Sequence, residues 1–192
     1  LGLARASLVG NSMGAGLAIG MALEHPDRVE RLVLLAGLPD HVTDKLASPL
    51  VKRSVESRAP IWLVELGNWL AGWTVTEKVL KEIIHDHTLL TPLVLERSYH
   101  NRRRPGLVRA LLTMARQLPE WETGYARRLG EIRHAPLILW GTDDQVFPLQ
   151  VGRELHAAIP RSEFVEIPDA GHIPQWERPD AVNAILADYL QP

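Results

Sequence analysis

The chain has 192 residues, a formal charge of −2 at pH 7 and a hydrophobic fraction of 46%. This length and composition suffice for a sizeable buried core. The nearly balanced charge argues against nucleic acid or an anionic membrane as the main partner. The sequence has no cysteine, which excludes disulfides, thiolate metal sites and a cysteine nucleophile. No apolar run reaches transmembrane length and nothing resembles a signal peptide. We therefore expect a cytoplasmic protein.

The first stretch that carries chemistry is Gly10-Asn11-Ser12-Met13-Gly14, which matches the G-x-S-x-G pattern of a nucleophile elbow. An aliphatic run precedes it and a helix of small residues follows it. In such a turn the serine hydroxyl projects from the sheet on a strained backbone, and the glycines leave room for neighbouring backbone. The new helix directs its dipole and free N–H groups toward an anion forming near Ser12. The pattern favours a nucleophilic Ser12 over an ordinary structural turn.

Residues 1–40 are typical of one α/β unit. We expect the last turn of a helix over 1–4 and a short strand over 6–9, with its side chains buried. The helix after Ser12 should end near His25, because Pro26 cannot continue it. The run 29–35 then predicts a strand buried on both faces, as parallel strands are. A strand, a helix and a second strand in this order form a βαβ unit.

Residues 41–131 have a different pattern, in which apolar residues recur at helical spacing. Five prolines divide this segment into what we expect to be several short helices. A helical insertion between strands most often serves as a lid over the site. Trp62, Trp69 and Trp73 indicate either a hydrophobic face of a helix or a substrate pocket, and these alternatives stay open. Arg102-Arg103-Arg104 is interpreted as a solvated basic run rather than an anion site.

The α/β pattern returns over residues 132–192, with expected strands over 136–141 and 162–167 and helices over 151–159 and 179–190. The sequence therefore predicts an α/β fold with a mostly parallel sheet. Its expected organisation is a first core part over 1–40, a helical lid insertion over 41–131, and a second core part over 132–192.

Three sets of polar side chains follow successive strands of the expected sheet: Ser12, the Asp143–Asp144 pair, and His172. Open α/β sheets place their sites at the carboxyl ends of the strands, so these side chains should meet. In a Ser-His-Asp triad the histidine takes the serine proton, and the carboxylate orients the imidazole and stabilises its charged form. At these residues the chain resembles the α/β-hydrolase superfamily, in which the triad follows the order Ser, Asp, His. The resemblance covers essentially the whole chain.

The resemblance implies an α/β-hydrolase fold of which this chain is the C-terminal portion, with an inserted helical lid. The acid of such proteins commonly lies in a pattern like Gly-x-x-Asp-x-Val-x-Pro. The stretch 141–148 fits that pattern with Asp144, which is preferred to Asp143, and Asp40 is a distant third choice. The elbow's donor to the oxyanion hole would be the backbone N–H of Met13.

The family's first strands and its His-Gly loop, which supplies the other oxyanion donor, do not precede Leu1. We therefore expect a fragment whose strand over 6–9 lies at an unpaired edge. Loss of one oxyanion donor costs about two to three orders of magnitude in rate, so the isolated chain is expected to be impaired or inactive.

Within the superfamily, the elbow and Gly171-His172 followed by Gln175-Trp176-Glu177 are similar to the meta-cleavage product hydrolases. Those enzymes cleave carbon–carbon bonds in dienoic ketoacids derived from aromatic rings. Their lid carries an arginine several residues ahead of a proline, and Arg97 before Pro105 is similar. The chain departs from that pattern at Ile173, where those enzymes usually have tryptophan. Related esterases and lactonases share much of the pattern.

The predicted function is hydrolysis of an ester, a lactone or an activated C–C bond in a small apolar substrate, through Ser12, Asp144 and His172. Val146 and Ile173 are expected substrate-binding residues because each neighbours a triad member, and the resemblance adds Arg97. No metal or organic cofactor is implied, since a triad alone supplies nucleophile, base and orienting group. The expected partner is a small molecule, with no nucleic acid or membrane, and the oligomeric state stays open. The alternative is a non-catalytic α/β-hydrolase-like module that binds a ligand or a partner.

Overall fold

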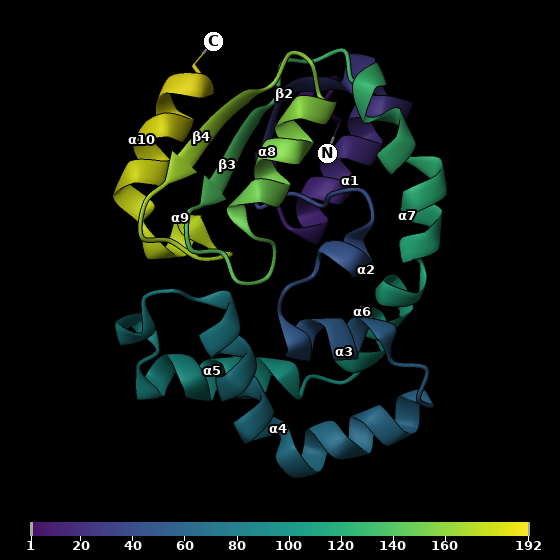
Figure 1. Cartoon of the computed structure of the whole chain (residues 1–192), viewed down its shortest axis with the longest axis vertical. Coiled ribbons are helices and arrows are strands. Elements are labelled where there is room, and N and C mark those ends of the chain that lie inside the picture. Colours follow the sequence, from purple (N-terminus) through teal and green to yellow (C-terminus); the bar gives the residue numbers. More distant parts are fainter. Residues whose placement is uncertain (1, 192) are drawn as a thin grey trace.

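The computed structural model describes residues 2–191 and shows a parallel sheet of four strands (Figure 1). The strands lie in the order β1 (Ala6–Asn11), β2 (Val29–Leu35), β3 (Leu137–Gly141) and β4 (Glu163–Ile167), and each neighbouring pair is parallel. Because β1 pairs with β2 alone, it forms one edge of the sheet, and Val9 on it is 48% exposed. The α/β class, the parallel sheet and the edge position of β1 are confirmed.

The two middle strands are rich in aliphatic residues because both faces of the sheet are covered. Successive side chains of a strand point to opposite faces. Accordingly, Leu32 and Leu34 enter the larger core cluster, which also contains side chains of α1 (Met13–Glu24) and α8 (Leu149–Ala158). Val33 and Leu35 belong to the second cluster, in which Val182 of α10 (Pro179–Tyr189) is buried. The sheet is therefore the middle layer between helices.

The segment 41–131, here called the lid segment, is helical in the structure. Its α-helices are α2 (Val42–Lys45), α3 (Pro49–Glu56), α4 (Ile61–Ile83), α5 (Pro92–Arg102), α6 (Leu107–Arg116) and α7 (Leu118–Gly124). Short 3-10 helices occur at Pro26–Arg28, His87–Leu89 and Ala126–Glu131, and α9 (Pro174–Glu177) precedes α10. Figure 1 shows α3 to α6 gathered beyond the ends of the strands to which the arrowheads of β3 and β4 point. These four helices thus lie on the carboxyl side of the sheet, whereas α7 lies beside α1.

Helix starts in the lid segment follow from local sequence. The Ser48 hydroxyl accepts a hydrogen bond from Val51 N at 3.1 Å, and Thr91 Oγ1 accepts one from Val94 N at 3.3 Å. Each of these capping residues is followed by proline at the first helical position. The fixed φ of proline suits a helix there, and the N–H that it lacks would have no intrahelical acceptor. The prediction of short helices is wrong for α4, which runs through 23 residues because no proline interrupts it.

Two further expectations at particular residues are wrong. Residues 2–4 form no helix, and Leu1 lies outside the described residues. Arg102 is not part of a solvated run, because its Nε donates to Asn68 Oδ1 and burial lowers the pKa of its guanidinium. Arg103 instead lies over the Tyr99 ring, 5.3 Å from the centroid.

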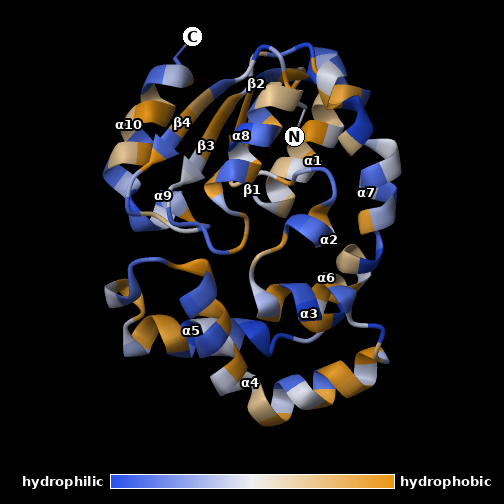
Figure 2. Cartoon of the chain, in the orientation of Figure 1, coloured by the Kyte–Doolittle hydropathy of each residue, from blue (hydrophilic) through white to orange (hydrophobic). Residues whose placement is uncertain are grey.

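The α4 helix packs with its apolar side outward. Trp62, Trp69 and Trp73 are 65%, 60% and 45% exposed, while the buried residues of α4 are Asn68, Gly72 and Thr76. The three tryptophans therefore belong to an exposed hydrophobic face of the helix, and a role in a substrate pocket stays a prediction. Figure 2 shows hydrophobic residues both in the strands and along α4. Even so, no helix among the described residues combines the length and the hydropathy needed to cross a membrane.

Candidate active site

Ser12 lies at the sharp turn between β1 and α1. Its φ of 53° and ψ of −115° fall in a region that non-glycine residues rarely adopt, at a cost of about 1–3 kcal/mol. The turn is tied to the sheet because Ser12 N donates to Leu35 O at 2.9 Å. A Cβ on Gly10 would lie 2.3 Å from the carbonyl carbon and oxygen of Gly14, so only glycine fits there. A Cβ on Gly14 would meet nothing within 4 Å, so the expected crowding is wrong at that position.

Met13 is the first residue of α1, directly after the serine. The N–H groups in the first turn of a helix have no intrahelical acceptor and carry the positive end of the helix dipole. The Met13 N–H therefore fits the predicted role as a donor to an oxyanion that forms on a carbonyl attacked by Ser12.

Asp144 and His172 form a buried pair. The Asp144 side chain is 0% exposed and the His172 side chain 8%, with Asp144 Oδ2 and His172 Nδ1 2.8 Å apart. Asp144 Oδ1 accepts hydrogen bonds from Val146 N at 2.8 Å and Phe147 N at 3.0 Å, which fixes the carboxylate. A carboxylate can only accept, so the imidazole donates from Nδ1 and keeps Nε2 available as a base.

The structure thus brings Asp144 to His172, and it places the two other candidate acids elsewhere. Asp143 accepts from its neighbour Thr142 Oγ1 at 2.6 Å, and Asp40 is paired with Lys45. Both partners are local in sequence. Asp143 Oδ1 also lies 3.9 Å from His85 Nδ1, a longer contact than the 2.8 Å between Asp144 and His172.

Asn11 holds parts of the candidate site together, a role that the sequence did not indicate. Its Nδ2 donates to Leu35 O and to His172 O, each at 3.1 Å. One side chain therefore joins the ends of β1 and β2 to the loop that carries the histidine, 161 positions away in sequence. Its only sequence signal was its place directly before Ser12. This contact puts the histidine loop beside the nucleophile turn at the carboxyl edge of the sheet.

The predicted substrate-binding residues have different environments. Val146 is 3% exposed and belongs to the larger core cluster, and its carbonyl accepts from Ala47 N at 3.0 Å. Ile173 is partly buried beside His172, and Arg97 is exposed on α5. A role in binding stays a prediction for all three, although the burial of Val146 favours packing.

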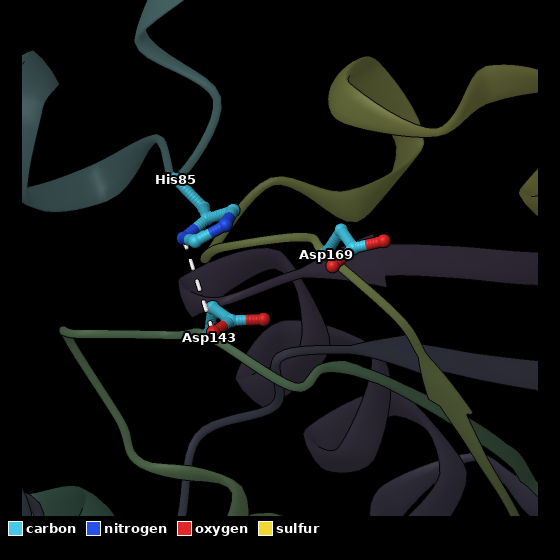
Figure 3. A group of neighbouring side chains, drawn as sticks. All are labelled: His85, Asp143 and Asp169. Carbon is cyan, nitrogen blue, oxygen red and sulfur yellow. Dashed lines mark ion pairs between the residues drawn. The ribbon is translucent and has the colours of Figure 1, made fainter.

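One group of side chains has the composition of a metal site. His85, Asp143 and Asp169 come from three loops, and Figure 3 shows the imidazole directed at Asp143. Their possible ligand atoms lie within 4.8 Å of one another, and His85 Nδ1 is 3.9 Å from Asp143 Oδ1. The His85 and Asp143 side chains are 38% and 41% exposed. Exposed carboxylates often lie together without an ion, and we assign no metal to this group.

The sequence matches the family described as alpha/beta hydrolase over residues 2–185. The chain belongs to this family. Among curated alpha/beta hydrolases it resembles a 2-hydroxy-6-oxo-6-phenylhexa-2,4-dienoate hydrolase from Burkholderia cepacia, with 30% identity over 191 residues, 99% of this chain and 64% of that protein. A 2-hydroxy-6-oxononadienedioate/2-hydroxy-6-oxononatrienedioate hydrolase from Pseudomonas putida is 32% identical over 199 residues, 100% of this chain and 64% of that protein.

Solved structures agree on the fold. The meta-cleavage product hydrolase CumD from Pseudomonas fluorescens IP01 superimposes with a TM-score of 0.77 at 22% identity, over 97% of this chain and 65% of that one. These comparisons confirm the predicted resemblance to C–C bond hydrolases within the alpha/beta hydrolase family. The chain spans 64% of the length of the curated relatives named above.

Proposed function

We propose that this protein is a serine hydrolase of small molecules and that it cleaves an activated C–C bond, as the names of its relatives indicate for them. The observation that carries the proposal is the buried Asp144–His172 pair, joined through Asn11 to the strained turn at Ser12. An ester or a lactone remains the second substrate class, because the same residues serve any acyl transfer.

The chemistry follows from the positions of these groups. His172 Nε2 takes the proton of Ser12 Oγ as the oxygen attacks the substrate carbonyl, and the oxyanion forms beside the Met13 N–H. Asp144 stabilises the imidazolium, which then gives its proton to the departing carbon or oxygen. Water, deprotonated by the same imidazole, releases the acyl group from Ser12 and restores the enzyme.

The first experiment is labelling of the protein with a fluorophosphonate probe, which reacts with an activated serine. We expect labelling of Ser12 and its loss in Ser12→Ala and His172→Ala. If folded protein shows no labelling of Ser12, the alternative holds, namely a non-catalytic module that binds a ligand or a partner.

A second experiment separates the two substrate classes through Arg97. A dienoic ketoacid presents a carboxylate, and a guanidinium can hold it with two parallel hydrogen bonds, which lysine cannot reproduce. Arg97→Ala and Arg97→Lys should both lose activity on a ring-cleavage ketoacid and keep activity on a neutral phenyl ester. Arg109→Ala, which removes an exposed arginine of α6, is the matched control. Equal effects on both substrates would make Arg97 an ordinary surface arginine.

The small-molecule substrate follows from the proposed chemistry. The cytoplasmic location and the absence of nucleic-acid, membrane, metal and cofactor partners stay predictions.

A further inference from the structure

Glu177 is a buried carboxylate that the mechanism above does not use. It ends the short helix α9 and is 4% exposed. Its Oε1 accepts a hydrogen bond from Gly171 N at 2.8 Å, and its Oε2 accepts from His85 N at 2.8 Å and Asp86 N at 3.0 Å. A buried carboxylate is costly unless its oxygens are hydrogen-bonded, and bonds from N–H to an ionised group are among the strong ones.

The three donors belong to two segments that are far apart in sequence. His85 and Asp86 follow the end of α4 in the lid segment, 92 and 91 positions from Glu177, whereas Gly171 directly precedes His172. The two segments also bond directly, because His172 N donates to Ile83 O at 2.8 Å. Glu177 therefore bridges the residues that follow α4 and the main chain directly before His172.

The contact between these segments leaves no free space. A Cβ on Gly171 would lie 2.6 Å from Ile83 O, 2.9 Å from His85 N and 3.0 Å from Glu177 Oε1. Side chains essentially never approach backbone atoms so closely, so glycine is required for the two segments to come together at the carboxylate. Rearrangement of one segment must consequently displace the other.

We propose that Glu177 is a positioning residue that holds the main chain of His172 and the end of α4 in one arrangement. This inference rests on the proposed function, because what it positions is the base for Ser12. The Asp144 bond fixes the imidazole at Nδ1, but the place of Nε2 also depends on where the backbone at 171–172 lies. A misplacement of about 1 Å costs about 10²-fold in rate.

The decisive variant is Glu177→Gln, which keeps the volume of the side chain. Its one carbonyl oxygen can accept from Gly171 or from the His85–Asp86 pair, but its NH₂ group then faces the N–H groups of the other segment. One of the two segments must therefore be released. Glu30→Gln, which changes an exposed carboxylate of β2, is the matched control.

We expect fluorophosphonate labelling of Ser12 to be about 10- to 100-fold slower in Glu177→Gln. In ester hydrolysis, this variant should change kcat more than KM. The rates are measured well below the melting temperature of either protein, so that loss of folded protein cannot explain them. A lower melting temperature with an unchanged labelling rate would make Glu177 a purely structural residue and overturn the proposal. If Glu177→Gln does not fold, Glu177→Asp replaces it, because the shorter carboxylate cannot reach both segments.

Backbone hydrogen exchange tests the same proposal without activity. In Glu177→Gln, exchange should accelerate at 83–86 and at 171–172 together, and Glu30→Gln should leave both unchanged. Faster exchange in neither segment, or in only one of them, would refute the bridge. Failure of the wild-type protein to label Ser12 would refute the proposed function, while the exchange result would still decide whether Glu177 couples the two segments.

Discussion

Replacement of Asp144 by asparagine separates the catalytic role of this residue from its structural one. The asparagine carbonyl oxygen can still accept from Val146 N and Phe147 N, as Asp144 Oδ1 does. Its amide nitrogen then points at His172 Nδ1, where the carboxylate Oδ2 lies at 2.8 Å in the wild type. Because the amide NH₂ and an imidazole Nδ1–H cannot donate to each other, the imidazole proton moves to Nε2. The nitrogen that should accept the Ser12 proton is then no longer a base.

The loss can be estimated from this change of tautomer. The same substitution in a Ser-His-Asp triad lowers kcat by about 10⁴, which is about 5.4 kcal/mol at 1.36 kcal/mol for each factor of ten. The cost to stability should be small by comparison, about 1–2 kcal/mol for exchange of a charged hydrogen bond for a neutral one. Asp144→Ala should destabilise more, because it also leaves two buried N–H groups unpaired at about 1–3 kcal/mol each.

The assay is ester hydrolysis or fluorophosphonate labelling, run beside thermal denaturation for Asp144→Asn, Asp144→Ala and the control Asp143→Asn. Only for Asp144→Asn do we expect a near-complete loss of activity while the melting temperature falls by just about 2–8 °C. Activity within tenfold of the wild type in that variant would refute the assignment of the acid, and a large loss in Asp143→Asn would transfer the role to Asp143.

Three further predictions test the surroundings of the site. Gly141→Ala should lower the melting temperature and the activity together, because its Cβ would lie 2.2 Å from Ala170 O and Gly171 O. The control Gly130→Ala should be tolerated, because the nearest atom to its Cβ would be 4.0 Å away. Equal melting temperatures of the two variants would contradict this prediction. Hydrogen bonds from the hydroxyl and the N–H of Thr88 lower the pKa of Asp86 below its ordinary 3.8, so the carboxylate stabilises the fold above that pH and loses this effect as the pH falls through the lowered value. Asp86→Asn should accordingly be less stable than wild type at pH 7 and equally stable in strong acid, as followed by denaturant unfolding; a difference that does not change with pH would count against it. Ile173→Trp should change the preference between large and small esters with little effect on the melting temperature, and a uniform loss that tracks stability would show that Ile173 only packs.

The sequence predicted the sheet well because its signals are local. Runs rich in aliphatic residues placed β2 at the residues where it lies and β3 within one residue of its observed bounds. The orientation of α4 could not be predicted in the same way, since helical spacing shows an apolar stripe but not the face that packs. That face is chosen by close approach to α5, where a Cβ on Gly72 would lie 3.3 Å from Tyr99 Cε2. Asn68, Gly72 and Thr76 are therefore the buried residues of α4, and its three tryptophans are 45% or more exposed.

In the candidate site, too, some residues could be predicted from the sequence and others could not. Ser12, Asp144 and His172 could be proposed from the sequence because each belongs to a short motif with its own residue spacing. The roles of Asn11 and Glu177 were missed because their side chains bond to backbone groups 6 to 161 positions away, and a sequence pattern does not show which backbone groups a side chain will reach. Residues that orient a site through the main chain are visible only in a structure.

The proposed nucleophile and the proposed base are held by different physical restraints, and Asn11 connects them. Ser12 is fixed by a strained turn that the fit of Gly10 against Gly14 maintains. His172 is fixed on three sides, by Asp144 at Nδ1, by Ile83 O at its N–H and by Asn11 at its carbonyl. Because Asn11 directly precedes the serine, displacement of the histidine loop also pulls on the end of β1. Substitutions at Asn11 and Glu177 should therefore fail to add in their effects on rate, since each relaxes a restraint on the same loop.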